Sequence, residues 1–121
     1  MIIAVYGTLK KGCSNHQLLS DCKYIGNGVT PPKYDLVDLN YFPGLVDGEN
    51  IVEVELYEVD NKDLLILDRL EGVPTLYTRE KEDIYINNID NPIISAYIYK
   101  LNHSLYKHYP TIPVNNGVVS W

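Results

Sequence analysis

Apolar and polar residues alternate along residues 51–59, where Val52, Val54 and Leu56 alternate with Glu53, Glu55 and Glu58 or Tyr57. A period of two residues is typical of a β-strand with one buried face. Residues 2–5 are instead continuously apolar, which indicates a short buried strand. Residues 23–37 mix apolar residues with glycines and prolines, so we expect short strands broken by turns.

Two further alternating segments cover residues 77–89 and 93–99. Between them lies Asp90-Asn91-Pro92, a combination of residues that favours turns. The pattern therefore predicts a β-hairpin.

Helical spacing is clearest in residues 61–70. Asp60 stands at the N-cap position with Asp63 three residues further on, and Gly72 and Pro74 follow the segment as helix terminators. A second short helix is expected from an Asn15 cap through Cys22.

The chain of 121 residues is 45% hydrophobic, which suits one compact domain spanning residues 1–121. Residues 102–121 contain prolines and a final apolar stretch, so we expect them to form a C-terminal tail that packs on the body. We expect a monomer or a weak homodimer.

The net charge of −6 and the scattered basic residues argue against nucleic acid as a partner. No apolar run approaches the ~20 residues of a transmembrane helix, and the start of the chain lacks signal-peptide features. We therefore expect a cytoplasmic protein with no membrane partner.

The cysteines and histidines offer little chemistry. Cys13 and Cys22 form no disulfide framework, and His16, His103 and His108 have no metal-ligand spacing, so we expect no metal site. Cys13 and His16 as a thiolate and its base lack a third, orienting group, so a structural role is favoured.

The loop Tyr6-Gly7-Thr8-Leu9 follows the first strand directly. Glycine permits positive φ and close approach of a ligand to the main chain, so N–H groups here are candidates for holding an anion. An ordinary strand-to-loop turn remains the alternative.

Glu71 shares a helical face with Leu64 and Leu67, at spacings of seven and four residues. Burial on that face and the negative end of the helix dipole would both raise its pKa, as suits a general base. Alternatively, Glu71 lies just past the helix end and turns into solvent.

Tyr77 and Arg79 are two residues apart on a predicted strand, so both project to the same side and are candidates to line a pocket with Glu71. A surface pairing of Arg79 with a glutamate is the alternative. Glu53 and Glu55 compete with Glu71 as the catalytic acid, but a solvated outer face is favoured for them.

Two blocks of sequence resemble the gamma-glutamylcyclotransferase-like family, and its gamma-glutamylamine cyclotransferase branch in particular. The blocks are Val5-Tyr6-Gly7-Thr8-Leu9-Lys10-Lys11-Gly12 with Asn15-His16, and Leu67-Asp68-Arg69-Leu70-Glu71-Gly72-Val73-Pro74 with Tyr77-Thr78-Arg79. Weaker similarity extends through Phe42-Pro43-Gly44-Leu45 and Glu55-Leu56-Tyr57-Glu58-Val59-Asp60.

The resemblance implies an α+β fold: a small mixed β-barrel of about five to seven strands flanked by two short helices. It implies that Tyr6, Gly7, Thr8 and Leu9 bind the glutamyl part of a substrate through main-chain groups, that Tyr77 and Arg79 shape the pocket, and that Glu71 is the catalytic acid/base.

The implied reaction is intramolecular aminolysis of a gamma-glutamyl amine or gamma-glutamyl amino acid. It yields 5-oxoproline and a free amine and requires no cofactor. Val54 departs from the family pattern, where many relatives have glycine, and the last twenty residues match no family pattern, so the leaving group stays open. A protein that binds or sequesters a small ligand in the same pocket without turning it over is the alternative function, and an interaction protein with a closed pocket is a third.

Overall fold

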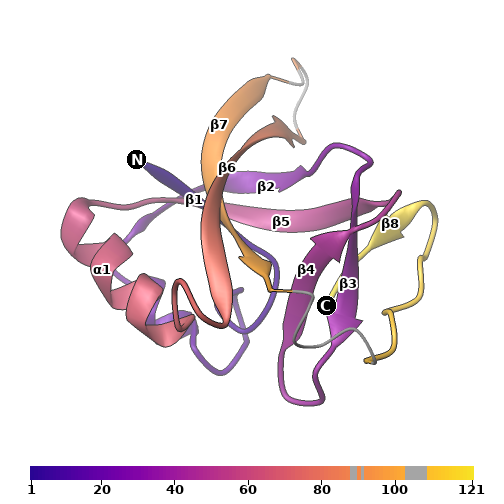
Figure 1. Ribbon diagram of the computed structural model, residues 1–121. Coiled ribbons are helices and arrows are strands. Elements are labelled where there is room, and N and C mark those ends of the chain that lie inside the picture. The colour runs from indigo at the N-terminus through magenta and orange to yellow at the C-terminus, as the bar shows by residue number, and fades with distance from the viewer. Residues whose placement is uncertain (88–89, 91, 103–108) are drawn as a thin grey trace.

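The computed structural model describes residues 1–87, 90, 92–102 and 109–121. Five strands close into a small barrel, and one further strand extends its sheet (Figure 1). Around the barrel the strands are β1 (Ile2–Val5), β7 (Ile93–Leu101), β6 (Tyr77–Ile86), β2 (Lys23–Val29) and β5 (Ile51–Glu58). β5 pairs with β1 and completes the circle. β1 and β7 are parallel and the other barrel pairs are antiparallel, so the predicted mixed barrel is confirmed.

The predicted hairpin is also confirmed. β6 and β7 pair from Tyr77 opposite Leu101 to Tyr85 opposite Ile93. Asn91 of the predicted turn lies outside the described residues.

A second, two-stranded sheet consists of β3 (Tyr34–Asp38) and β4 (Pro43–Asp47). β8 (Val118–Val119) runs parallel to the start of β5, so the last residues of the chain add a strand to the barrel sheet. In Figure 1 the β3–β4 hairpin and β8 lie on the right and the helix α1 on the left, with the barrel between them.

Helix α1 (Asn61–Leu70) has the predicted bounds. The Asp60 carboxylate accepts a hydrogen bond from the Asp63 N–H at 2.8 Å, and the Asp63 carboxylate accepts one from the Asp60 N–H at 3.0 Å. This reciprocal capping box satisfies main-chain donors that the first turn leaves free. Gly72, with φ of 62°, follows the helix in the left-handed conformation that glycine favours.

The second predicted helix was wrong in type and length. Only a single 3₁₀ turn forms, His16–Leu19, and the Asn15 side chain caps nothing. The Asn15 amide instead donates to Thr8 Oγ1 at 2.9 Å, and His16 Nδ1 bonds to the Leu9 carbonyl at 2.9 Å. These contacts tie the segment back to the first loop, so the described part of the barrel has one α-helix beside it and not two.

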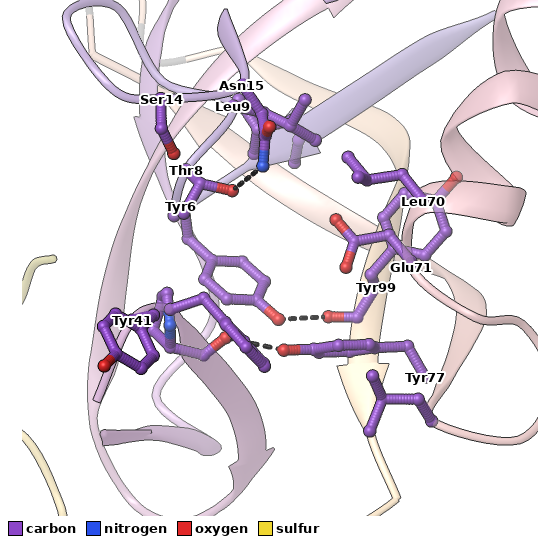
Figure 2. Close-up of a pocket in the computed structure, with 16 residues that line it drawn as sticks. Tyr6, Thr8, Leu9, Ser14, Asn15, Tyr41, Leu70, Glu71, Tyr77 and Tyr99 are labelled. Atoms are coloured by element: carbon purple, nitrogen blue, oxygen red, sulfur yellow. Dashed lines mark hydrogen bonds between the residues drawn. The ribbon is translucent and has the colours of Figure 1, made fainter. Parts of the chain in front are cut away.

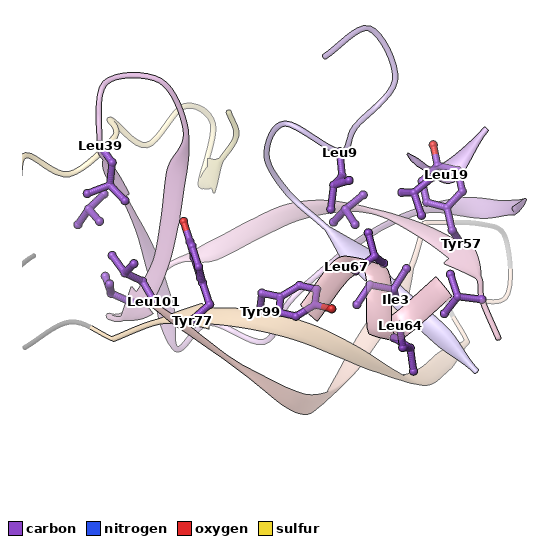
Figure 3. Close-up of a cluster of buried hydrophobic side chains, with 14 residues drawn as sticks. Ile3, Leu9, Leu19, Leu39, Tyr57, Leu64, Leu67, Tyr77, Tyr99 and Leu101 are labelled. Atoms are coloured by element: carbon purple, nitrogen blue, oxygen red, sulfur yellow. The ribbon is translucent and has the colours of Figure 1, made fainter. Parts of the chain in front are cut away.

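The hydrophobic core has two layers that share β1. Ala4 belongs to the barrel interior, whereas Ile3 and Val5 face the layer beneath α1. This double burial explains why the first strand is continuously apolar. Figure 3 shows Leu64 and Leu67 of α1 in the layer beneath the helix, with Ile3 and Leu9 close by.

The alternation in β5 also has a structural meaning. Val52, Val54 and Leu56 are fully buried in the barrel interior. Glu53 and Glu55 alternate with them and are partly exposed. The Glu55 carboxylate accepts hydrogen bonds from the Lys11 N–H and the Tyr57 hydroxyl, both at 2.9 Å, and so links the first loop to β5.

Candidate active site

A cavity of about 370 Å³ opens where β1 ends, between the first loop, the β3–β4 hairpin and the end of α1. Sixteen residues from distant parts of the sequence line it (Figure 2). They are Ala4, Val5, Tyr6, Gly7, Thr8, Leu9, Ser14, Asn15, Tyr41, Phe42, Pro43, Leu70, Glu71, Leu76, Tyr77 and Tyr99. The cavity thus includes every residue that the sequence proposes for the site except Arg79.

The first loop forms one wall of this cavity. Gly7 does not take a positive φ, which corrects the expectation drawn from its residue type. Its glycine identity has a steric reason: a Cβ there would lie 2.8 Å from Pro43 Cγ and 2.9 Å from Pro43 Cδ. The Pro43 ring of β4 therefore occupies the space that any side chain at residue 7 would need.

The loop also carries available hydrogen-bond donors. Within the described part of the chain, none of the hydrogen bonds uses the N–H groups of Gly7, Thr8 or Leu9 as donor. The loop is nevertheless held in shape by its own turns, since the Lys10 N–H donates to the Gly7 carbonyl at 3.0 Å and the Asn15 N–H to the Thr8 carbonyl at 2.9 Å. Fixed main-chain N–H groups beside a cavity are suited to an anionic group of a ligand.

Tyr6 forms a fixed part of the cavity wall, and its hydroxyl is not available as an acid. Its buried hydroxyl donates to the Tyr99 carbonyl at 2.7 Å and accepts from the Leu45 N–H at 3.0 Å. Burial, together with Tyr77 and Glu71 nearby, raises the pKa of Tyr6 well above its ordinary value, so the phenol stays neutral. Tyr77 is fixed in a similar way, because its hydroxyl donates to the Pro43 carbonyl at 2.8 Å.

Glu71 sits at the C-cap of α1, with its N–H bonded to the Leu67 carbonyl at 2.9 Å. Figure 2 shows its carboxylate pointing into the cavity, with Tyr6 and Thr8 on the opposite side. The alternative of a solvent-facing Glu71 is therefore wrong. Burial raises the pKa of Glu71 from 4.5 to about 7, because a charged carboxylate loses hydration there.

Glu71 is also the one residue with an ionisable carboxylate in the lining of the cavity, and no lysine, arginine or histidine of the described chain lines it. A carboxyl group with a pKa near 7 exchanges protons readily in both directions. Glu71 is therefore the candidate for proton transfer among the described lining residues.

Arg79 does not line the cavity. Its guanidinium lies 3.7 Å from the Asp68 carboxylate and 4.7 Å from the centre of the Tyr97 ring. Asp68 in turn accepts a hydrogen bond from the Tyr99 hydroxyl at 2.8 Å, and Tyr99 lines the cavity. Arg79 thus contacts the site indirectly, through Asp68 and the Tyr99 side chain.

The sequence does not identify Tyr41 and Tyr99 as lining residues, and it does not show that Asn15 lines the cavity. The sequence does point to Phe42 and Pro43 as site residues, since they fall in the weaker block of family resemblance. No sequence pattern points to Tyr99 as a site residue, because only barrel closure brings β7 beside the first loop. Asn15 has the residue type of a helix cap, although its side chain belongs to the loop.

The other candidate groups contribute no chemistry to this cavity. Cys13 and Cys22 are free thiols outside the lining, and burial, with Asp63 nearby, raises the pKa of Cys22 to about 11. His16 Nδ1 must carry the proton, because its partner is a carbonyl. Among the described residues no group of histidines, cysteines and acids could hold a metal ion, and no helix is long and apolar enough to cross a membrane. His103 and His108 lie outside the described residues.

A closed barrel with a cavity at the end of β1, lined by one glutamate of raised pKa and by main-chain N–H groups, has the geometry of a small-molecule site. Comparison with known proteins gives the family. The family described as gamma-glutamyl cyclotransferase, AIG2-like, matches residues 3–116, and the chain belongs to it. The match extends into the last twenty residues, which corrects the expectation that they follow no family pattern. The predicted family and its enzymatic class, a gamma-glutamylcyclotransferase, are thereby confirmed.

Individual relatives agree with this assignment. A Vibrio cholerae protein assigned to the gamma-glutamylcyclotransferases is 41% identical over 107 residues, which is 87% of each chain. The gamma-glutamylaminecyclotransferase of Homo sapiens is 35% identical over 88 residues, covering 64% of this chain and 58% of that protein. The crystal structure of an AIG2-like protein from Mus musculus superposes with a TM-score of 0.79 at 28% identity, over 90% of this chain and 83% of that one.

Proposed function

We propose that this protein converts a gamma-glutamyl amine or gamma-glutamyl amino acid into 5-oxoproline and a free amine, with Glu71 as general acid and base. The observation that carries the proposal is the Glu71 carboxylate, half-buried in the cavity, opposite the main chain of the first loop. Membership of the gamma-glutamyl cyclotransferase family supports the reaction class.

The proton balance assigns Glu71 its role. The α-ammonium of the glutamyl group loses one proton to the Glu71 carboxylate, and the free amine attacks the γ-carbonyl to form the new C–N bond of the lactam. Glu71 then donates to the leaving nitrogen as the old C–N bond breaks. The second proton that the lactam nitrogen loses ends on the released amine, so the products are 5-oxoproline and an ammonium ion.

In this proposal the first loop binds the negatively charged groups of the substrate. The N–H groups of Gly7, Thr8 and Leu9 are available donors, and the described lining contains no side-chain cation. We assign to them the substrate α-carboxylate and the oxyanion that develops on the γ-carbonyl. Tyr6 and Tyr77 hold the loop and the Pro43 wall in place by buried hydrogen bonds.

Positioning then supplies much of the rate. Ring closure joins two groups of one molecule, and effective molarities of ~10⁵ to 10⁸ M are reached when such groups are well oriented. A preformed cavity that holds the glutamyl chain in a folded conformation is sufficient for this orientation. Proton transfer remains, and it falls to Glu71.

The test is formation of 5-oxoproline from a panel of gamma-glutamyl amines and amino acids by the wild type, Glu71→Gln and Glu58→Gln. Glu58 is an exposed glutamate on β5 and serves as the matched control. We expect Glu71→Gln to lower kcat by ~10²- to 10⁴-fold, the usual contribution of a general acid-base, and Glu58→Gln to retain activity.

Two results would contradict the proposal. Full turnover by Glu71→Gln would remove Glu71 from the mechanism. A panel compound that raises the melting temperature of the wild type, yet is recovered unchanged after long incubation, would favour a binding protein.

A further inference from the structure

Asn15 lines the cavity although its residue type suits a helix cap, and its side chain turns back toward the first loop. The Asn15 N–H donates to the Thr8 carbonyl and the Asn15 side-chain amide donates to Thr8 Oγ1, both at 2.9 Å. Figure 2 shows the side-chain bond at the wall of the cavity that faces Glu71. Asn15 therefore fixes both the main chain and the side chain of one loop residue.

The main-chain bond sets the direction of one donor. A trans peptide is planar, so its C=O and its N–H point in opposite directions. The peptide between Thr8 and Leu9 is trans, and its carbonyl is bound to the Asn15 N–H. The Leu9 N–H therefore points away from the Asn15 main chain, and it is one of the available donors of the first loop.

The side-chain bond sets the direction of a second donor. A hydroxyl has one proton to donate and two lone pairs that accept. Thr8 Oγ1 accepts from the Asn15 amide, and no hydrogen bond among the described residues uses the Thr8 hydroxyl proton. One lone pair is thus occupied, and the proton is left for a ligand in the cavity, which Thr8 lines.

The proposed substrate has one group that fits two such donors. Its α-ammonium can only donate hydrogen bonds, whereas its α-carboxylate can only accept them. In the proposed reaction the ammonium gives its proton to Glu71, so the carboxylate belongs at the opposite wall. Hydrogen bonds to an ionised acceptor are stronger than those between neutral groups, so an oriented hydroxyl is valuable there.

We infer that Asn15 is a positioning residue, which holds Thr8 so that the Thr8 hydroxyl donates to the α-carboxylate of the bound glutamyl group. This inference rests on the proposed function, because that carboxylate belongs to its substrate. It adds one side-chain donor, with the residue that orients it, to the main-chain groups of the first loop.

The experiment compares two ligands with the same ring. 5-Oxoproline, the product of the proposed reaction, carries the carboxylate, and 2-pyrrolidinone lacks it. NMR titration measures weak binding of both and requires no turnover. We expect the wild type to bind 5-oxoproline more tightly than 2-pyrrolidinone.

Thr8→Val removes the hydroxyl and should weaken 5-oxoproline binding by about tenfold, the usual effect of losing one hydrogen bond to a charged group. Asn15→Ala should weaken it by about threefold, because a hydroxyl that nothing holds is distributed over about three staggered positions. Neither change should alter the affinity for 2-pyrrolidinone.

The double variant Asn15→Ala with Thr8→Val tests whether Asn15 acts through Thr8. It should bind 5-oxoproline as weakly as Thr8→Val alone, because the hydroxyl that Asn15 orients is already absent. Thr8→Ser keeps a hydroxyl and should keep the affinity. Gln17→Ala, which removes an exposed amide outside the cavity lining, is the matched control and should bind like the wild type.

Three results would overturn the inference: no preference of the wild type for 5-oxoproline, equal losses for 2-pyrrolidinone, or a further threefold loss on adding Asn15→Ala to Thr8→Val. The proposed function fails on a different result, namely no formation of 5-oxoproline from gamma-glutamyl compounds by the wild type. The binding measurements decide the role of Asn15 in either case.

Discussion

At the scale of single residues, the site depends on one carboxyl group in an unusual setting. Glu71 follows the last turn of α1, where helical spacing places it on the same face as the buried Leu64 and Leu67. Burial raises its pKa to about 7 and no cation of the described lining opposes this. A group with that pKa is a stronger base than an ordinary glutamate and still donates a proton near neutral pH.

The pH dependence of activity follows from this pKa. In the proposed reaction Glu71 must be ionised to accept the first proton, so kcat/KM should rise with pH up to an inflection near 7 and fall about tenfold per pH unit below it. The measurement is 5-oxoproline formation between about pH 4 and 8 at low substrate concentration. An inflection close to 4.5, the ordinary glutamate value, would contradict the assignment.

At the scale of elements, β4 packs directly against the first loop. Pro43 occupies the space beside Gly7, and the Leu45 N–H donates to the Tyr6 hydroxyl. The hydroxyl of Tyr77, on β6, also donates to the Pro43 carbonyl. The loop, β4 and β6 therefore fit together as one unit around the buried end of the cavity.

Gly7→Ala tests this fit. The new Cβ would lie 2.8 and 2.9 Å from two carbons of the Pro43 ring, so the loop or β4 must move. We expect KM to rise by about tenfold or more, a larger change than that in kcat, together with a loss of about 1–3 kcal/mol in the free energy of unfolding.

The double variant Gly7→Ala with Pro43→Ala is the control. Removing the ring frees the space, so the double variant should be more stable than the sum of the two single changes predicts. Strict additivity of the unfolding free energies would show that the Pro43 ring is not what excludes a side chain at residue 7.

At the scale of the whole molecule, the barrel and α1 together shield Glu71 from much of the surrounding water. The layer of core between them includes Ile3 and Val5 of β1, Leu64 and Leu67 of α1, and Tyr99 of β7. Such packing costs stability when Glu71 ionises, because the unfolded chain hydrates the carboxylate fully.

Stability should therefore depend on pH with a definite sign. The folded pKa of Glu71 lies above the unfolded value, so the folded state binds the proton more tightly, and Glu71 lowers stability as pH rises from 4.5 toward 7. Glu71→Gln removes this penalty, and we expect it to be about 1–3 kcal/mol more stable than the wild type at about pH 8 and nearly equal to it at about pH 4. Urea unfolding at both pH values measures the difference, with Glu58→Gln as the exposed control. A difference that does not grow with pH over this range would contradict the burial of Glu71.

Near neighbours in the chain are enough to specify several parts of this protein. The capping box of Asp60 and Asp63, the strand of residues 51–58 and the helical face of Glu71 all rest on spacings of two to seven residues, which local geometry fixes. Helix α1 accordingly has its predicted bounds, and its periodicity places Glu71 on the face of Leu64 and Leu67.

The surroundings of those parts follow from tertiary contacts alone. Gly7 is glycine because Pro43 of β4 lies beside it and leaves no space for a side chain. Tyr99 reaches the cavity, and Arg79 stays outside it, because the barrel closes between β1 and β5 and pairs β7 with β1. Each of these outcomes depends on contacts that bring separate segments of the chain together, which periodicity and local propensity do not encode.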